Sequence, residues 1–299
     1  MVRVIGHFAA VSFKSVVCRV KEGNTLKNYF KLGILPFLIA EAMLFMISFF
    51  VIILFELMVG LRLGFSQGME AFRNLEVLTE LIRGALSQDA GYQLSALTVA
   101  IWGLLSFIWY RVETNGEVHS KTEEFLSGKN LFLFILLGLG GQGFFSGAIG
   151  LLMGSFPNFF ESYTDTIGSL VQGNRFVVVL YTVLIAPVAE ELVFRGVILH
   201  KAGRVLPFIG ANILQAAFFG IYHQNIVQGI YAALLGFLFG VVCRKFNSLY
   251  ASILLHILVN ASAFLVMLLP NSVQNSIMMT TGGILLTVVS IISLKIWKL

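Results

Sequence analysis

Eight stretches of mostly apolar residues, each close to the length of a membrane span, set the strongest limit on what this chain can fold into. A helix needs about 20 apolar residues to cross the hydrocarbon core of a bilayer. The stretches cover approximately residues 34–60, 94–112, 130–152, 176–199, 207–223, 226–243, 248–269 and 276–297. The fifth is short and ends in a polar turn. The sequence therefore predicts an all-α fold, a polytopic membrane helical bundle with about eight transmembrane helices.

Composition supports this prediction and excludes several classes of protein. Of the 299 residues, 58% are hydrophobic and 12% are charged, and this charged share is about half that of a typical globular domain. A soluble enzyme, a disordered chain, a disulfide scaffold and a secreted protein are therefore excluded. The two cysteines, Cys18 and Cys243, lie far apart without metal-ligand spacing, which favours inert thiols over a site.

The basic residues predict the orientation of the helices through the positive-inside rule. With the N-terminus placed in the cytoplasm, 15 lysines and arginines fall in cytoplasmic segments, 4 fall in external ones, and Arg195 lies near a helix end. This distribution predicts a multi-pass protein of the cell membrane with both termini cytoplasmic and an external loop at 153–175. Residues 3–21 fit either an amphipathic helix on the membrane surface or a disordered basic tail. Residues 66–90 suggest a surface helix.

Three pairs of glycines spaced by four residues predict close contacts between helices. They are Gly143 with Gly147, Gly150 with Gly154, and Gly236 with Gly240. We interpret them as packing residues without a chemical role. The sequence shows no internal repeat, which counts against a typical secondary transporter.

Six ionisable side chains lie in apolar context, where a charge near the bilayer centre costs about 2.5–3.5 kcal/mol on insertion scales. They are Glu41, Glu56, Glu190, Glu191, His223 and His256. Adjacent helical residues point about 100° apart, so Glu190 and Glu191 are expected to face different neighbours. Arg195 follows Glu191 by four residues, which predicts an ion pair on one helix face. Glu190 lacks that partner, and beside an imidazole it is suited to accept a proton from water.

Two histidines and an asparagine extend the candidate site. His223 lies 33 residues after Glu190, and His256 lies 33 residues after His223, which is about one helix out and one helix back each time. Asn260 follows His256 by four residues and projects from the same helix face. We expect these three side chains and Glu190 to line one cavity, as a catalytic or ion-binding site would require.

Three motifs in this order resemble a known family. Residues 190–196 read EExxFRG, residues 219–223 read FxxxH, and residues 256–260 read HxxxN. Their order and spacing resemble the CAAX protease and bacteriocin-processing family, also called CPBP or Abi, which includes the type II CAAX prenyl endopeptidases. The resemblance covers roughly residues 170–265. It implies a hydrolase, an intramembrane endopeptidase of the glutamic type that acts on membrane-associated or lipidated peptides or proteins, in CAAX-type or leader-peptide processing.

The resemblance also implies the roles of the site residues. Glu190 matches the general base, which works with His223 to activate water. His256 and Asn260 match the groups that stabilise the oxyanion of the tetrahedral intermediate. A carboxylate with an imidazole can take the proton of the attacking water, and N–H groups can donate to the oxyanion, so no serine or cysteine nucleophile is required. The ion pair of Glu191 and Arg195 is expected to support this site.

On this basis the chain divides into three parts. Residues 1–165 hold the amphipathic N-terminus and three transmembrane helices, residues 166–270 form the catalytic core that resembles the family, and residues 271–299 form a C-terminal transmembrane helix. The expected partners are membrane lipid and a membrane-associated peptide or protein substrate, and nucleic acid is not expected.

Several alternatives stay open from the sequence. We expect no cofactor, but a glutamate with two histidines is a known catalytic zinc set, so a zinc metalloprotease is the rival mechanism, although HExxH is absent. Glu41 and Glu56, with the other buried ionisable residues, could relay protons in a secondary transporter or ion channel. A non-catalytic immunity or scaffold protein with the same fold is the third alternative.

Overall fold

The computed structural model describes residues 26–67, 76, 79–80, 84, 88–114, 125–172, 174–268 and 275–296. Its elements are α2 (Leu26–Tyr29), η1 (Phe30–Ile34), α3 (Leu35–Gln67), α5 (Gln88–Glu113), α7 (Gly128–Met153), α8 (Pro157–Gln172), α9 (Arg175–Val179), η2 (Leu180–Ile185), α10 (Ala186–Glu191), η3 (Leu192–Leu199), α11 (His200–Ala202), α12 (Phe208–Tyr222), α13 (Ile226–Phe246), α14 (Leu249–Met267) and α15 (Ser276–Leu294). The η elements are π-helical turns that continue their α-helical neighbours. These residues contain no strand, which confirms the predicted all-α class.

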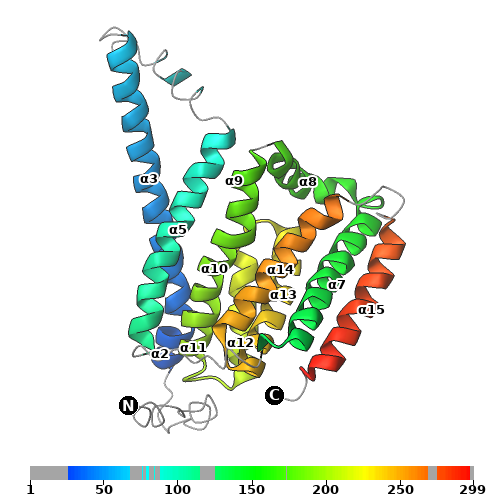
Figure 1. The fold of residues 1–299 in the computed structure, drawn as a ribbon. Coiled ribbons are helices and arrows are strands. Elements are labelled where there is room, and N and C mark those ends of the chain that lie inside the picture. The colour runs from blue at the N-terminus through cyan, green and yellow to red at the C-terminus, as the bar shows by residue number, and fades with distance from the viewer. Residues whose placement is uncertain are drawn as a thin grey trace, which may run out of the picture.

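The helices form a polytopic bundle, as predicted (Figure 1). Within the described residues, seven helical segments are long and apolar enough to cross a membrane, and they correspond to seven of the eight predicted spans. The remaining prediction, at 207–223, forms α12, whose 15 residues extend only about 22 Å. α12 packs against α13 as a hairpin, α7 packs against α14 and α15, and α3 packs against α5. The protein is therefore a multi-pass membrane protein with one short helix.

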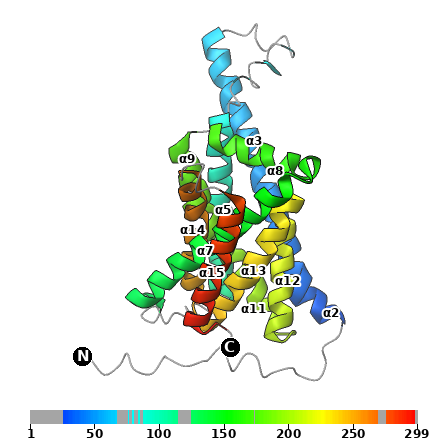
Figure 2. The ribbon, with the colours of Figure 1, turned by 90° about the vertical axis from the view of Figure 1, so that its right-hand side faces the viewer.

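The described chain begins and ends at the same end of the bundle (Figures 1 and 2). α2 lies at the end where α15 finishes, together with α11 and the junction between α13 and α14. We call this the terminal end. An even number of crossings follows from this arrangement, counting the short α12.

The predicted external loop at 153–175 contains a helix, α8, at the opposite end of the bundle (Figure 1). It lies beside the turn that joins α12 to α13. Asn225 Nδ2 in that turn donates to Ser162 Oγ over 3.2 Å, and the rings of Tyr163 and Tyr231 meet edge-on, 6.3 Å apart. α8 therefore covers the turn that follows the short helix.

The predicted glycine contacts occur at some of the six positions. At Gly147, a Cβ would collide with the backbone of Thr280 and the carbonyl oxygen of Ser276, so α7 and α15 approach closely there. Gly150 is also crowded by Ser276, whereas the space beside Gly154 is open. The small residues thus bring α7 against α15, the interface that attaches the last span to the bundle.

Several predictions fall on residues that the structure does not describe. Cys18 and the predicted N-terminal amphipathic helix lie outside the described residues, as does most of the predicted surface helix at 66–90. Cys243 lies in α13 as a buried free thiol.

Candidate active site

The span that carries the two glutamates has an interrupted hydrogen-bond ladder. α10 lies between the π-helical segments η2 and η3. In a π-helix the carbonyl of residue i accepts from the N–H of residue i+5, and the Ala186 N–H bonds to the Tyr181 carbonyl in this way. The Thr182 carbonyl would then need the N–H of Pro187, which proline lacks. The sequence therefore frees one carbonyl oxygen inside the membrane span.

Asn260 supplies the missing donor. Its Nδ2 donates to the Thr182 carbonyl oxygen over 2.8 Å. An unpaired carbonyl in hydrocarbon costs several kcal/mol, so this bond fixes α14 against η2. The amide group has two N–H donors, and the bond to Thr182 uses one of them. The second N–H can serve another acceptor.

Glu191 is the centre of the most buried polar cluster. Both Glu191 and Arg195 have side chains that are 0% exposed, and Arg195 Nη1 donates to Glu191 Oε1 over 2.7 Å. This is the ion pair that the spacing of four residues predicts. His256 Nδ1 meets the same carboxylate oxygen at 2.9 Å, from 65 residues away in the sequence. Because a carboxylate accepts, Nδ1 carries the hydrogen of this bond.

Glu190 approaches the other nitrogen of the same imidazole. Its Oε2 lies 3.7 Å from His256 Nε2, and its side chain is buried. The expectation that the two carboxylates face different neighbours is therefore wrong for His256, because α14 inserts this ring between them. It is right for Arg195, whose ion pair is with Glu191. Glu190 has no ion pair with lysine or arginine in the described part of the chain.

A network that the sequence analysis did not assign to the site holds Arg195 from the side of α12 and α13. Arg195 Nη2 donates to the Gly236 carbonyl over 2.9 Å, and Gln215 Nε2 donates to the same oxygen over 3.0 Å. Gln215 Nε2 also donates to Asn212 Oδ1 over 2.7 Å. A Cβ at Gly236 would press on this guanidinium, so that glycine has a role beyond helix packing. The signal in the sequence was two amide side chains, three residues apart, inside an apolar stretch.

Two phenylalanines enclose the charged groups. Arg195 Cζ lies 4.6 Å from the ring centre of Phe219 and 5.2 Å from that of Phe239, a geometry that favours a cation. Phe239 stacks on His256 with ring centres 4.6 Å apart. Phe219 presents its edge to His256 at 5.7 Å and to His223 at 4.8 Å. The rings shield the cluster from water and hold both imidazoles around one aromatic side chain.

His223 lies at the C-terminal end of α12, close to this cluster. Its Nδ1 donates to the Phe219 carbonyl oxygen over 2.8 Å, since a carbonyl oxygen can only accept. In the neutral ring, Nε2 is therefore left as an acceptor. Phe219 presents its edge to both His223 and His256, so both imidazoles contact one ring. Among the described residues, His223 has no hydrogen bond to either carboxylate.

The two glutamates of α3 lie apart from one another. Glu41 is half-buried, and its Oε1 has no hydrogen-bonding partner among the described residues. Trp102 Nε1 donates to the neighbouring Ala40 carbonyl over 3.0 Å, which fixes α5 to this part of α3. Glu56 follows Glu41 by 15 residues on α3, and its side chain is exposed. α3 therefore does not present both carboxylates to the bundle.

The arrangement is suited to acid–base chemistry. Two carboxylates flank one imidazole, and a second imidazole stands nearby with a free acceptor nitrogen. Within the described ranges, no three histidine, cysteine, aspartate or glutamate side chains are placed to hold a metal ion. Glu191 Oε1 already accepts from two donors, so Glu191 and the two histidines do not form a preassembled zinc site.

Comparison with known proteins finds one family match for this part of the chain. Residues 172–262 match the family model described as type II CAAX prenyl endopeptidase Rce1-like. The match contains both glutamates, both histidines and Asn260, and it confirms the resemblance carried by the three motifs. No curated protein and no solved structure matches the chain.

Proposed function

We propose that this multi-pass protein is an intramembrane endopeptidase in which Glu190 and His223 activate the attacking water. The match to the CAAX-type endopeptidase family supports the reaction class. The observation that carries the proposal is the placement of two buried carboxylates on the two ring nitrogens of His256. Burying this cluster is costly, and ionisable groups inside a membrane protein mark functional sites.

Glu190 is the general base in this proposal. Its carboxylate is not neutralised by Arg195, whose ion pair is with Glu191. His223 offers Nε2 as an acceptor in the neutral ring, because its Nδ1 is bonded to the Phe219 carbonyl. A water molecule bonded to both groups would lose its proton to them as it attacks the peptide carbonyl.

His256 and Asn260 stabilise the oxyanion. The bond from His256 Nδ1 to Glu191 fixes the orientation of the ring, in the way that a carboxylate orients the histidine of a catalytic triad. Because Nδ1 donates to Glu191, Nε2 can donate to an oxyanion only in the imidazolium form of the ring. In that form Nε2, which is 3.7 Å from Glu190 without a short hydrogen bond to it, is the donor when substrate enters. The second N–H of Asn260 is the other donor.

A cleavage assay tests this function. Purified protein in detergent or vesicles is incubated with three versions of one peptide: prenylated on a cysteine near its C-terminus, unprenylated, and prenylated with an amidated C-terminus. We expect hydrolysis of the prenylated peptide by the wild type and none by Glu190→Gln. Equal activity of a folded Glu190→Gln protein would refute the mechanism, and loss of activity on adding a chelator, restored by zinc, would replace it with the metal mechanism.

The orientation proposed from the charge distribution places the terminal end in the cytoplasm. The described chain ends at the same face as it begins (Figure 1), so both termini would share that compartment. Reporter fusions at the C-terminus and within 153–175 should report opposite sides of the membrane. An external C-terminus would refute this topology.

A further inference from the structure

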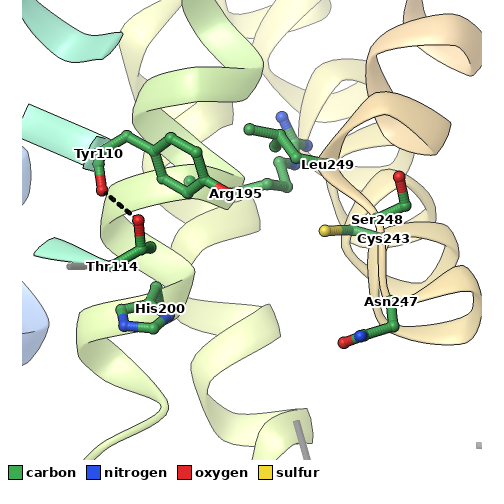
Figure 3. A pocket seen from close by; sticks show the side chains of 9 residues that line it. Tyr110, Thr114, Arg195, His200, Cys243, Asn247, Ser248 and Leu249 are labelled. Atoms are coloured by element: carbon green, nitrogen blue, oxygen red, sulfur yellow. Dashed lines mark hydrogen bonds between the residues drawn. The ribbon is translucent and has the colours of Figure 1, made fainter. Parts of the chain in front are cut away.

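α5 contacts both helices that carry the groups proposed to activate water. It packs against α10 and η3 in the span of the two glutamates, and its Tyr110 lines a small cavity together with Arg195 of that span (Figure 3). Through Trp102 it also reaches α12, the helix whose C-cap residue is His223. α5 comes before the family match, which covers residues 172–262. The contacts of α5 therefore show what the earlier part of the chain adds to the site.

Gly103 brings the backbone of α5 against the residue that precedes Glu190. A Cβ at Gly103 would lie 2.9 Å from the Cβ of Ala189 and 3.3 Å from its Cα. An ordinary van der Waals contact is 3.4–4 Å long, so glycine is what allows the two helices to come this close. Adjacent helical residues point about 100° apart. Ala189 can therefore rest on α5 while Glu190 is directed to His256.

The neighbouring residue, Trp102, contacts the residue that precedes His223. Its ring stacks on the ring of Tyr222, with ring centres 5.6 Å apart and planes 10° from parallel. The rings of Tyr222 and His223 in turn meet edge to face, 5.3 Å apart. Trp102 is 0% exposed, and its Nε1 donates to the Ala40 carbonyl over 3.0 Å. The indole is thus held in place, and it limits how Tyr222 can turn.

The two contacts share one geometry. Each group proposed to activate water follows, by one residue, a side chain that rests on α5, and the two supporting residues of α5 are adjacent. α12 is too short to span the hydrocarbon core, so the membrane alone does not fix the depth of His223. A pair of adjacent residues that contacts both helices can fix it. Such precision matters, since a misplacement of about 1 Å can lower a rate about 100-fold.

We propose that α5 supplies a spacer to the active site: its Trp102-Gly103 pair holds the general base and its imidazole partner at the separation that one water molecule needs to bond to both. Gly103 acts through Ala189. Trp102 acts through Tyr222. Both are positioning residues, because neither contacts the reacting groups directly. The role of the spacer in water activation rests on the proposed function, whereas the two helix contacts do not.

An exchange of side chains across the contact of Gly103 with Ala189 tests the spacer in the purified full chain. Gly103→Ala should move α10 away from α5 by about 0.5 Å, the difference between 2.9 Å and an ordinary contact of 3.4 Å. We expect kcat for the prenylated peptide to fall about tenfold, with a smaller change in KM because the contacts of the peptide are kept. Adding Ala189→Gly removes the opposing Cβ and should restore most of the lost rate.

Gly91→Ala is the matched control, since the space beside this glycine of the same helix is open. It should leave kcat and KM at their wild-type values. Melting temperatures of the same samples show which variants are folded, and rates are compared per folded molecule. A folded Gly103→Ala protein with the wild-type rate, or a double variant no faster than the single one, would overturn the proposal.

Trp102→Leu tests the second contact without any need for activity. It removes the ring that stacks on Tyr222, so the NMR signal of the His223 ring should shift. The chain holds five histidines, and in protein with isotope-labelled histidine the signal of His223 is the one that His223→Gln removes. Trp109→Leu is the matched control, because Trp109 is a half-buried tryptophan of the same helix; it should leave this signal in place. An unmoved His223 signal in folded Trp102→Leu would overturn the proposal.

The two measurements separate the spacer from the proposed function. A wild-type protein that cleaves no peptide would reject the proposed function, and the NMR signal would still decide whether Trp102 positions His223. If Gly103→Ala does not fold, Trp102→Leu supplies the cleavage test, with an expected severalfold loss of kcat. Trp102→Phe keeps a ring on Tyr222 and should recover part of that loss. Equal rates of wild type and folded Trp102→Leu would reject the spacer alone.

Discussion

Two clusters, each a glutamate paired with basic side chains, lie at different depths in this protein. In the inner cluster, Glu191 and Arg195 are fully buried and share their carboxylate with His256. In the outer cluster, at the terminal end, Glu113 of α5 accepts from Lys201 Nζ over 2.6 Å and from Arg204 Nη1 over 2.7 Å. The outer side chains keep 11–39% of their surface exposed.

This difference in depth indicates which cluster serves the chemistry. Partly exposed ion pairs contribute about 0–1 kcal/mol to stability and are screened by salt. A buried pair loses its hydration, and replacing it by apolar residues is often neutral or stabilising, so stability alone does not explain its presence. The outer cluster joins α5 to the end of the Arg175–Ala202 span. The inner cluster is better explained by the reaction proposed for it.

The largest expected effect comes from Glu190, the inner carboxylate without an arginine. Glu190→Gln keeps the shape of the side chain and removes the general base, so we expect peptide cleavage to fall about 10²–10⁴-fold. The melting temperature should change little. Rates on a prenylated peptide, measured with the circular dichroism melt of the same sample, would check this. Near-normal cleavage by the folded variant would reject Glu190 as the general base.

Glu191→Gln should break the architecture of the inner cluster. It leaves the buried guanidinium of Arg195 without its counter-charge, and breaking a buried pair costs about 3–5 kcal/mol of unfolding free energy. Because Glu191 also orients His256, cleavage per folded molecule should fall as well. Adding Arg195→Met removes the unpaired charge and should restore part of the stability but none of the activity. Unfolding in mixed micelles would measure the first effect, and equal stability of wild type and single variant would contradict it.

A smaller effect is expected where Asn260 meets the carbonyl that Pro187 leaves free. Asn260→Leu has a similar shape and leaves the Thr182 oxygen without a donor, at a cost of about 1–3 kcal/mol. In a Pro187→Ala background the chain regains an N–H at that position, so the same substitution should cost less. A double-mutant cycle of unfolding free energies gives the coupling, and strictly additive effects would show that the proline and the amide are independent.

The smallest effect is expected in the outer cluster. Glu113→Gln should lower the unfolding free energy by about 1 kcal/mol or less, and 1 M salt should reduce the difference further. Cleavage by the folded protein should be unchanged, since Glu113 contacts the end of the bundle and not the inner cluster. A loss as large as that of Glu191→Gln would remove the distinction between the two clusters.

The sequence predicted those parts of the fold and the site that depend on local spacing. Apolar length predicted the helices, and the spacing of four residues predicted the pair of Glu191 and Arg195. The bond from His256 to Glu191 depends on the rotation of α14 about its own axis, and residue spacing within one helix does not predict that rotation. The bond from Asn260 to Thr182 had a visible cause in Pro187, but only with knowledge that the span is π-helical at that point.

The short α12 has a consequence for the lipid around the protein. Its 15 residues reach about 22 Å, whereas the hydrocarbon core of a typical bilayer is about 30 Å thick. The remaining depth must therefore be covered by a thinner bilayer, by headgroups that move toward the end of α12, or by α8. That end carries His223 and the turn that α8 covers. A substrate would leave the hydrocarbon core by its shortest path beside α12. The acyl-chain length of the surrounding lipids should therefore change the cleavage rate more strongly than the type of lipid headgroup does.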